Sequence, residues 1–186
     1  MVFKYKKNVS SFIIILTIIV LIYAIARLLM TKQYKFGDKI GVFDGVAAYS
    51  NQKDETKSKT SNFYNGKYTG RRWQCVEFVR RYLISKRGVT FSDVTSAFEI
   101  PKARFTTLNG VPVQTTNELK IGSIIVWPKN YQKMTPDGHV AIISSISSSG
   151  INVVEQNYID NKFNRFIKFC DLRNVTILCV KYVFYN

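Results

Sequence analysis

The sequence predicts an α+β fold in which a helix packs on an antiparallel sheet, with an apolar segment before the folded part. The chain has 186 residues, 46% of them hydrophobic and 14% aromatic, which suits one packed core. A helical spacing of apolar residues begins at Cys75. Apolar stretches typical of strands follow at residues 123–127, 139–146, 152–156, 163–169 and 175–183. We therefore expect one folded domain over residues 31–186.

The N-terminal segment differs in composition from the rest of the chain. A short basic tail, residues 1–11, precedes an apolar run at residues 12–30 that only Thr17 and Arg27 interrupt. About twenty apolar residues are needed to cross the hydrocarbon of a bilayer, and a terminal arginine can reach the interface. We therefore expect residues 12–30 to form a transmembrane helix that makes this a single-pass membrane protein. The alternative is a secretory signal cleaved near Ala26, which would give a secreted protein.

The charge and the cysteines narrow the range of partners. A formal net charge of +15 is compatible with binding to nucleic acid or to an anionic membrane. The basic residues are scattered and no nucleic-acid motif accompanies them, so we predict no specific nucleic-acid binding. Cys75, Cys170 and Cys179 have no C-x-x-C spacing and predict neither a disulfide framework nor a zinc site. We expect no metal and no cofactor, and the oligomeric state stays open.

The segment around Cys75 predicts a helix with a reactive first turn. Residues 51–67 are polar without an apolar period and predict a surface loop. From Cys75 onward, Phe78, Val79 and Leu83 share one helix face. The positive end of the helix dipole stabilises a thiolate, and the unpaired N–H groups of a first turn can bind an oxyanion. Cys75 is thus a candidate nucleophile, and a structural cysteine is the alternative.

A single histidine follows in the chain. His139 lies after Gly138 at the start of an apolar run that predicts a buried strand. A thiol hydrolase needs a base that carries a proton near neutral pH, and imidazole suits that role. His139 is therefore the candidate general base. A structural histidine is the alternative.

An acidic residue follows the next predicted strand. Residues 147–150 separate the strand that begins at His139 from the strand that ends near Glu155, so the two strands predict a hairpin. A carboxylate that accepts a hydrogen bond from the far ring nitrogen fixes the tautomer of the histidine. Glu155 is the candidate orienting residue, and a solvated surface acid is the alternative. Cysteine, then histidine on a strand, then a polar orienting residue is the chain order of papain-like hydrolases.

Three segments together resemble the CHAP family of cysteine- and histidine-dependent amidohydrolases and peptidases, most closely the amidase domains of glutathionylspermidine synthetase/amidases. They are Tyr68-Thr-Gly-Arg-Arg-Trp-Gln-Cys75-Val-Glu-Phe78, Gly138-His-Val-Ala-Ile-Ile143 and Glu155-Gln-Asn157. The resemblance implies a papain-like α+β domain that hydrolyses amide bonds through a thioester on Cys75, without a cofactor.

The resemblance also implies where and what the domain binds. Arg80, Asn157, Gln74 and Trp73 match positions that contact the substrate, although Arg80 has the alternative of an exposed helix charge. The implied substrate is a glutathione–polyamine conjugate or another peptide amide. A peptidoglycan amidase or endopeptidase is the alternative function, and a binding module without turnover is a third.

Overall fold

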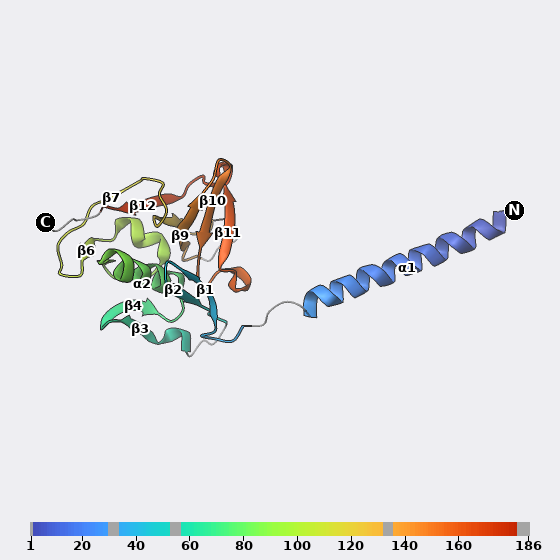
Figure 1. The fold of residues 1–186 in the computed structure, drawn as a ribbon, viewed down its shortest axis with the longest axis horizontal. Coiled ribbons are helices and arrows are strands. Elements are labelled where there is room, and N and C mark those ends of the chain that lie inside the picture. The colour runs from blue at the N-terminus through green and yellow to red at the C-terminus, as the bar shows by residue number, and fades with distance from the viewer. Residues whose placement is uncertain (1, 30–33, 53–56, 132–135, 182–186) are drawn as a thin grey trace. The chain divides into compact units, whose positions relative to one another are not determined.

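The computed structural model describes residues 2–29, 34–52, 57–131 and 136–181. The chain divides into two units, residues 1–33 and residues 34–186. The described part of the first unit is a helix, α1 (Val2–Leu29). The second unit carries the sheets (Figure 1).

The transmembrane prediction for residues 12–30 is wrong. Nowhere in the described ranges is there a helix long and apolar enough to cross a membrane. The predictions of a membrane partner and of a single-pass localisation depend on this helix, and they are wrong as well.

The second unit is built on a sheet of six strands in the order β11-β10-β9-β8-β12-β7. Each neighbouring pair in it is antiparallel. The bounds are β7 (Thr115–Thr116), β8 (Ile124–Trp127), β9 (His139–Ile146), β10 (Gly150–Val154), β11 (Asn164–Lys168) and β12 (Thr176–Val180). The predicted α+β class and the antiparallel sheet are therefore confirmed. Of the last predicted strand, residues 182–183 lie outside the described residues.

The helix predicted from Cys75 is confirmed as α2 (Cys75–Arg87). It ends at Gly88, whose φ of 62° is the left-handed conformation of a helix C-cap and whose N–H donates to the carbonyl of Leu83. Its apolar face, including Phe78 and Leu83, is fully buried. α2 packs against β9, β4 (Lys67–Arg71) and β2 (Val46–Tyr49), and Figure 1 shows it beside β2 and β4. The start of α2 is thus held against the strand that begins with His139.

Short elements surround this core. Two-stranded sheets form between β1 (Lys39–Phe43) and β2, between β3 (Ser61–Tyr64) and β4 (Lys67–Arg71), and between β5 (Val89–Phe91) and β6 (Phe105–Thr107). Short segments of 3-10 helix span Lys57–Lys59, Ala97–Lys102, Ile159–Asn161 and Phe169–Asp171.

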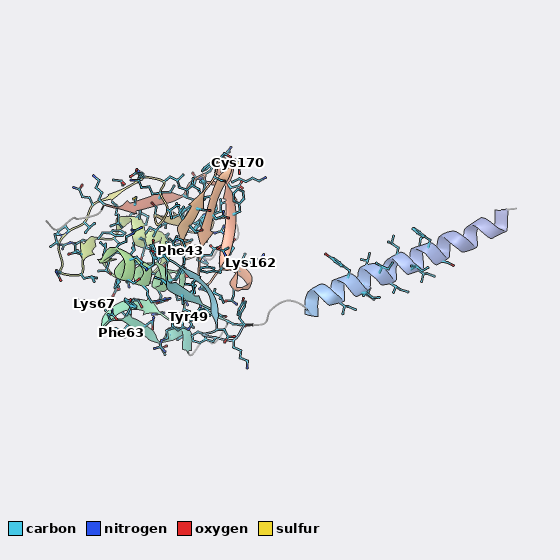
Figure 2. All side chains as sticks on the ribbon, viewed as in Figure 1. Phe43, Tyr49, Phe63, Lys67, Lys162 and Cys170 are labelled. Carbon is cyan, nitrogen blue, oxygen red and sulfur yellow. The ribbon has the colours of Figure 1, made fainter. Side chains whose placement is uncertain are left out.

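The surface loop predicted for residues 51–67 is wrong in its second half. That half holds a 3-10 turn and strand β3, which pairs with β4. Asn62 points inward and is buried, whereas Phe63 is 60% exposed, so the strand carries no apolar period. Figure 2 labels Phe63 and Lys67 on this hairpin.

Candidate active site

Cys75 is the first residue of α2, and its half-buried side chain borders a cavity of about 750 Å3. The residue before it, Gln74, is extended, so the helix begins abruptly at the cysteine. The carbonyl of Gln74 accepts from the N–H of Phe78 at 3.2 Å. The N–H groups before Phe78 have no partner further back in the helix, which is the general property of a first turn. They are candidate donors to an oxyanion beside the Cys75 sulfur.

His139 begins β9, is buried and borders the same cavity. β9 pairs with β10, so the predicted hairpin is confirmed. Glu155 directly follows β10 and is fully buried. Nε2 of His139 donates to Oε2 of Glu155 at 3.0 Å. This leaves Nδ1 as the ring nitrogen for Cys75, with which His139 also forms a hydrogen bond.

The charges around His139 favour its protonated form. Burial lowers the pKa of His139. The charges and hydrogen bonds of Cys75 and Glu155 outweigh burial and raise the pKa to about 9. At neutral pH the imidazolium of His139 is therefore favoured, and it lies between the Cys75 sulfur and the Glu155 carboxylate. It is a ready proton donor beside the candidate nucleophile.

Arg165 in β11 also binds the carboxylate of Glu155, and sequence reasoning missed it. Its Nε donates to Oε1 at 2.7 Å and its Nη2 to Oε2 at 2.8 Å. Burial raises the pKa of Glu155, but the hydrogen bonds and charges of Arg165 and His139 outweigh it and hold the pKa below its usual value. The sequence does carry a signal for it. Arg165 stands two residues before Ile167, the buried residue of the same strand, and residues two apart in a strand share one face.

A second buried carboxylate, Glu77, was also missed. It accepts from Nε of Arg81 at 2.6 Å, from Asn62 at 2.9 Å, from Thr69 at 3.1 Å and from Gln156 at 2.9 Å. Its signal was an acid four residues before an arginine on the same predicted helix. The network ties the first turn of α2 to the β3–β4 hairpin and to the residue after Glu155.

The residues predicted to contact substrate separate into two groups. Gln74, Arg80 and Asn157 border the cavity with Cys75 and His139. Trp73 instead packs on Tyr49, with ring centroids 4.3 Å apart. The structure therefore brings three of the four to the cavity.

Arg80 and Asn157 already have partners inside the protein. Arg80 is 3% exposed, so its alternative interpretation as an exposed helix charge is wrong. Its Nη1 lies 3.0 Å from Oδ1 of Asp93. Nδ2 of Asn157 donates to Oε1 of Gln74 at 2.6 Å, which fixes that amide at the start of α2.

The other two thiols lie outside the cavity lining. All three cysteines are free. Cys179 is half-buried in β12, whereas Cys170 is exposed. It lies in a 3-10 turn after β11, and Figure 2 shows it at the edge of the sheet. The described ranges hold no group of histidine, cysteine and acidic residues that could bind a metal ion.

The chain is similar to known proteins in sequence and in structure. The model of the CHAP domain family matches residues 64–157. Bifunctional glutathionylspermidine synthetase/amidase of Escherichia coli (strain K12) is 33% identical over 141 residues, which are 67% of this chain and 23% of that protein. Glutathionylspermidine synthase of Crithidia fasciculata is 34% identical over 111 residues, which are 54% of this chain and 15% of that protein. The chain thus spans less than a quarter of the length of these relatives.

Among solved structures, an N-acetylmuramoyl-L-alanine amidase from Staphylococcus aureus is similar with a TM-score of 0.46 and 17% identity. The match covers 66% of this chain and 34% of that one.

Proposed function

The chain belongs to the CHAP domain family and is an amidase-like hydrolase, and on that premise we propose that it cleaves amides with Cys75 as the nucleophile. His139 is the proton carrier and Glu155 orients it. The contact from Cys75 to His139 to Glu155 beside the cavity carries the proposal. It supplies the nucleophile, the base and the orienting group that this chemistry requires.

The first half of the reaction forms a thioester. The Cys75 thiolate attacks the carbonyl carbon of the amide, and first-turn N–H groups of α2 stabilise the oxyanion. As the tetrahedral intermediate collapses, the C–N bond breaks and Nδ1 of the His139 imidazolium gives its proton to the leaving nitrogen. A neutral amine departs, and the acyl group stays on sulfur.

The second half restores the site. Neutral His139 takes a proton from water, and the hydroxide attacks the thioester carbonyl. The C–S bond breaks, the thiolate leaves and the acid is released. His139 is again an imidazolium, so the ion pair is ready for another cycle.

For the substrate, we propose an amide between a glutathionyl acyl group and a polyamine. The names of the relatives suggest this class. The cavity lining supports it, because Arg80 and Arg71 can attract substrate carboxylates while Asp93 and Asp137 can attract a cationic amine. Cell-wall peptides are the competing substrate in the test.

The test assays the full chain against glutathionylspermidine and against cell-wall peptide fragments in parallel. We expect cleavage of glutathionylspermidine. Arg80→Ala should lower kcat/KM by about tenfold to a thousandfold, since a contact to a charged group typically contributes a few kcal/mol. Arg104→Ala is the matched control, because it removes an exposed arginine that does not border the cavity. Cleavage of wall peptide alone, or equal losses in both variants, would overturn the substrate proposal.

Thiol reactivity gives a test without substrate. At about pH 6 an ordinary thiol is almost wholly protonated, whereas Cys75 has an imidazolium beside it. Limiting iodoacetamide at that pH should label Cys75 first, as measured by peptide mass spectrometry. Cys170 is the internal control, because it is the more exposed thiol and access alone would favour it. Preferential labelling of Cys170 would contradict the assignment.

The pH profile should report the titration of His139. Its pKa is raised to about 9, so the imidazolium is present below that pH and is lost as the pH rises through it. We expect kcat/KM to fall above about pH 9, because the leaving amine then has no proton donor. In Glu155→Gln the alkaline limb should move to lower pH, since one negative neighbour is gone. An unchanged alkaline limb in that variant would count against Glu155 as the orienting residue.

A further inference from the structure

We propose that Arg165 is a positioning residue for catalysis, which holds Glu155 charged and oriented while His139 gains and loses its proton. The inference rests on the proposed roles of Cys75 and His139. It adds a fourth member to the contacts of Cys75, His139 and Glu155.

The first support is geometric. Arg165 binds Glu155 through two parallel hydrogen bonds, of 2.7 and 2.8 Å, and such paired bonds fix the plane of a carboxylate. Oε2 is shared, because it also accepts from Nε2 of His139 at 3.0 Å. A rotation of the Glu155 carboxylate would therefore break the bond to His139 and the two bonds to Arg165 together.

The second support is an aromatic clamp formed by Trp127 and Tyr158. The guanidinium carbon of Arg165 lies 4.7 Å from the ring centroid of Trp127 and 4.2 Å from that of Tyr158. The same two rings lie 5.7 and 5.2 Å from the ring of His139. The clamp contacts both cations that bind Glu155, so the guanidinium has little freedom to leave the carboxylate.

The third support comes from the reaction cycle. Glu155 is fully buried, and a buried carboxylate tends to take up a proton unless a cation faces it. In the thioester state His139 is neutral, so it no longer supplies that charge. Arg165 keeps its charge throughout. It is therefore the group that keeps Glu155 an anion when His139 must act as a base.

The other titratable groups nearby are few. Cys75 lies beyond His139, and Tyr131 and Tyr158 act on Arg165. Asp171 borders a small cavity beside the guanidinium. Within the described part of the chain, the groups that hold the pKa of Glu155 down are Arg165 and His139.

The test follows Cys75 alkylation by iodoacetamide as a function of pH in the full chain, so it needs no substrate. Protonation of Glu155 removes a negative charge beside His139 and so lowers the pKa of His139. The imidazolium that stabilises the reactive Cys75 thiolate is then less favoured. In the unmodified chain the acidic limb of the rate profile should lie well below neutral pH. In Arg165→Gln burial is no longer opposed by the guanidinium, so that limb should move up by about one pH unit or more. Arg165→Lys should move it less, because the cation is kept.

Lys168→Gln is the matched control, since it removes an exposed cation from the same strand. It should leave the profile unchanged. On glutathionylspermidine, Arg165→Gln should lower kcat about tenfold to a hundredfold with KM little changed, because general acid–base catalysis is impaired while binding is kept.

The possible results distinguish failure of the Arg165 proposal from failure of the Cys75 proposal. An acidic limb that stays the same in Arg165→Gln, in a chain whose circular dichroism shows it folded, would overturn the positioning role. Should Arg165→Gln not fold, Arg165→Lys decides, because a profile and kcat identical to those of the unmodified chain would also overturn it. Failure of the proposed function is distinct, since Cys75 would then not be the selectively alkylated thiol in the unmodified chain.

Discussion

Cys75→Ala is expected to abolish amide turnover, with kcat/KM reduced by about 10⁴-fold or more, because no other group replaces a lost nucleophile. The thiol contributes a bond to the acyl group, not only a contact. The measurement is product formation by the full chain at high enzyme concentration.

Cys170→Ala is the matched control. It removes an exposed thiol outside the cavity lining and should keep full activity. Activity in Cys75→Ala above about a hundredth of that of the unmodified chain exceeds what an enzyme without its nucleophile retains. Such a value would remove Cys75 from the chemistry.

Glu77→Ala is expected to give the largest loss of stability. Arg81 would remain buried without its carboxylate, and the side chains of Asn62 and Gln156 would lose an acceptor. Removing one partner of a buried ion pair typically costs about 3 to 5 kcal/mol. Urea denaturation followed by circular dichroism should therefore show a lower free energy of unfolding by about that amount.

Glu118→Ala is its control, because Glu118 pairs with Lys120 at 2.8 Å on the surface. Surface ion pairs contribute little, so its denaturation curve should stay close to that of the unmodified chain. Equal losses in the two variants would show that the Glu77 network does not hold the start of α2. A loss confined to Glu77→Ala supports the account in which this network fixes Cys75.

The local features of the site could be predicted from the sequence. The helix at Cys75 is marked by its apolar spacing, and the hairpin after His139 by two apolar runs around a short serine-rich turn. Because a hairpin brings neighbouring segments together, Glu155 could be placed beside His139 without knowledge of the fold. These signals depend only on residues close in the chain.

The features that depend on distant partners could not be predicted. Glu77 binds Gln156, 79 positions away, and no local pattern indicates that pairing. Strand β3 has a buried asparagine where an apolar residue would mark the inward face. Its sequence therefore lacks the alternation of apolar and polar residues that predicts a strand. Trp73 matches the family motif, yet it packs on Tyr49 instead of bordering the cavity, because a motif does not say which way each side chain points.

The most direct test of the central claim is detection of the acyl-enzyme. The full chain is mixed with excess glutathionylspermidine, quenched in acid within the first turnovers, and mapped by peptide mass spectrometry. We predict the mass of the glutathionyl acyl group on the peptide that contains Cys75, and none in Cys75→Ala. An acyl group carried by another residue, or formed equally in Cys75→Ala, would contradict the account.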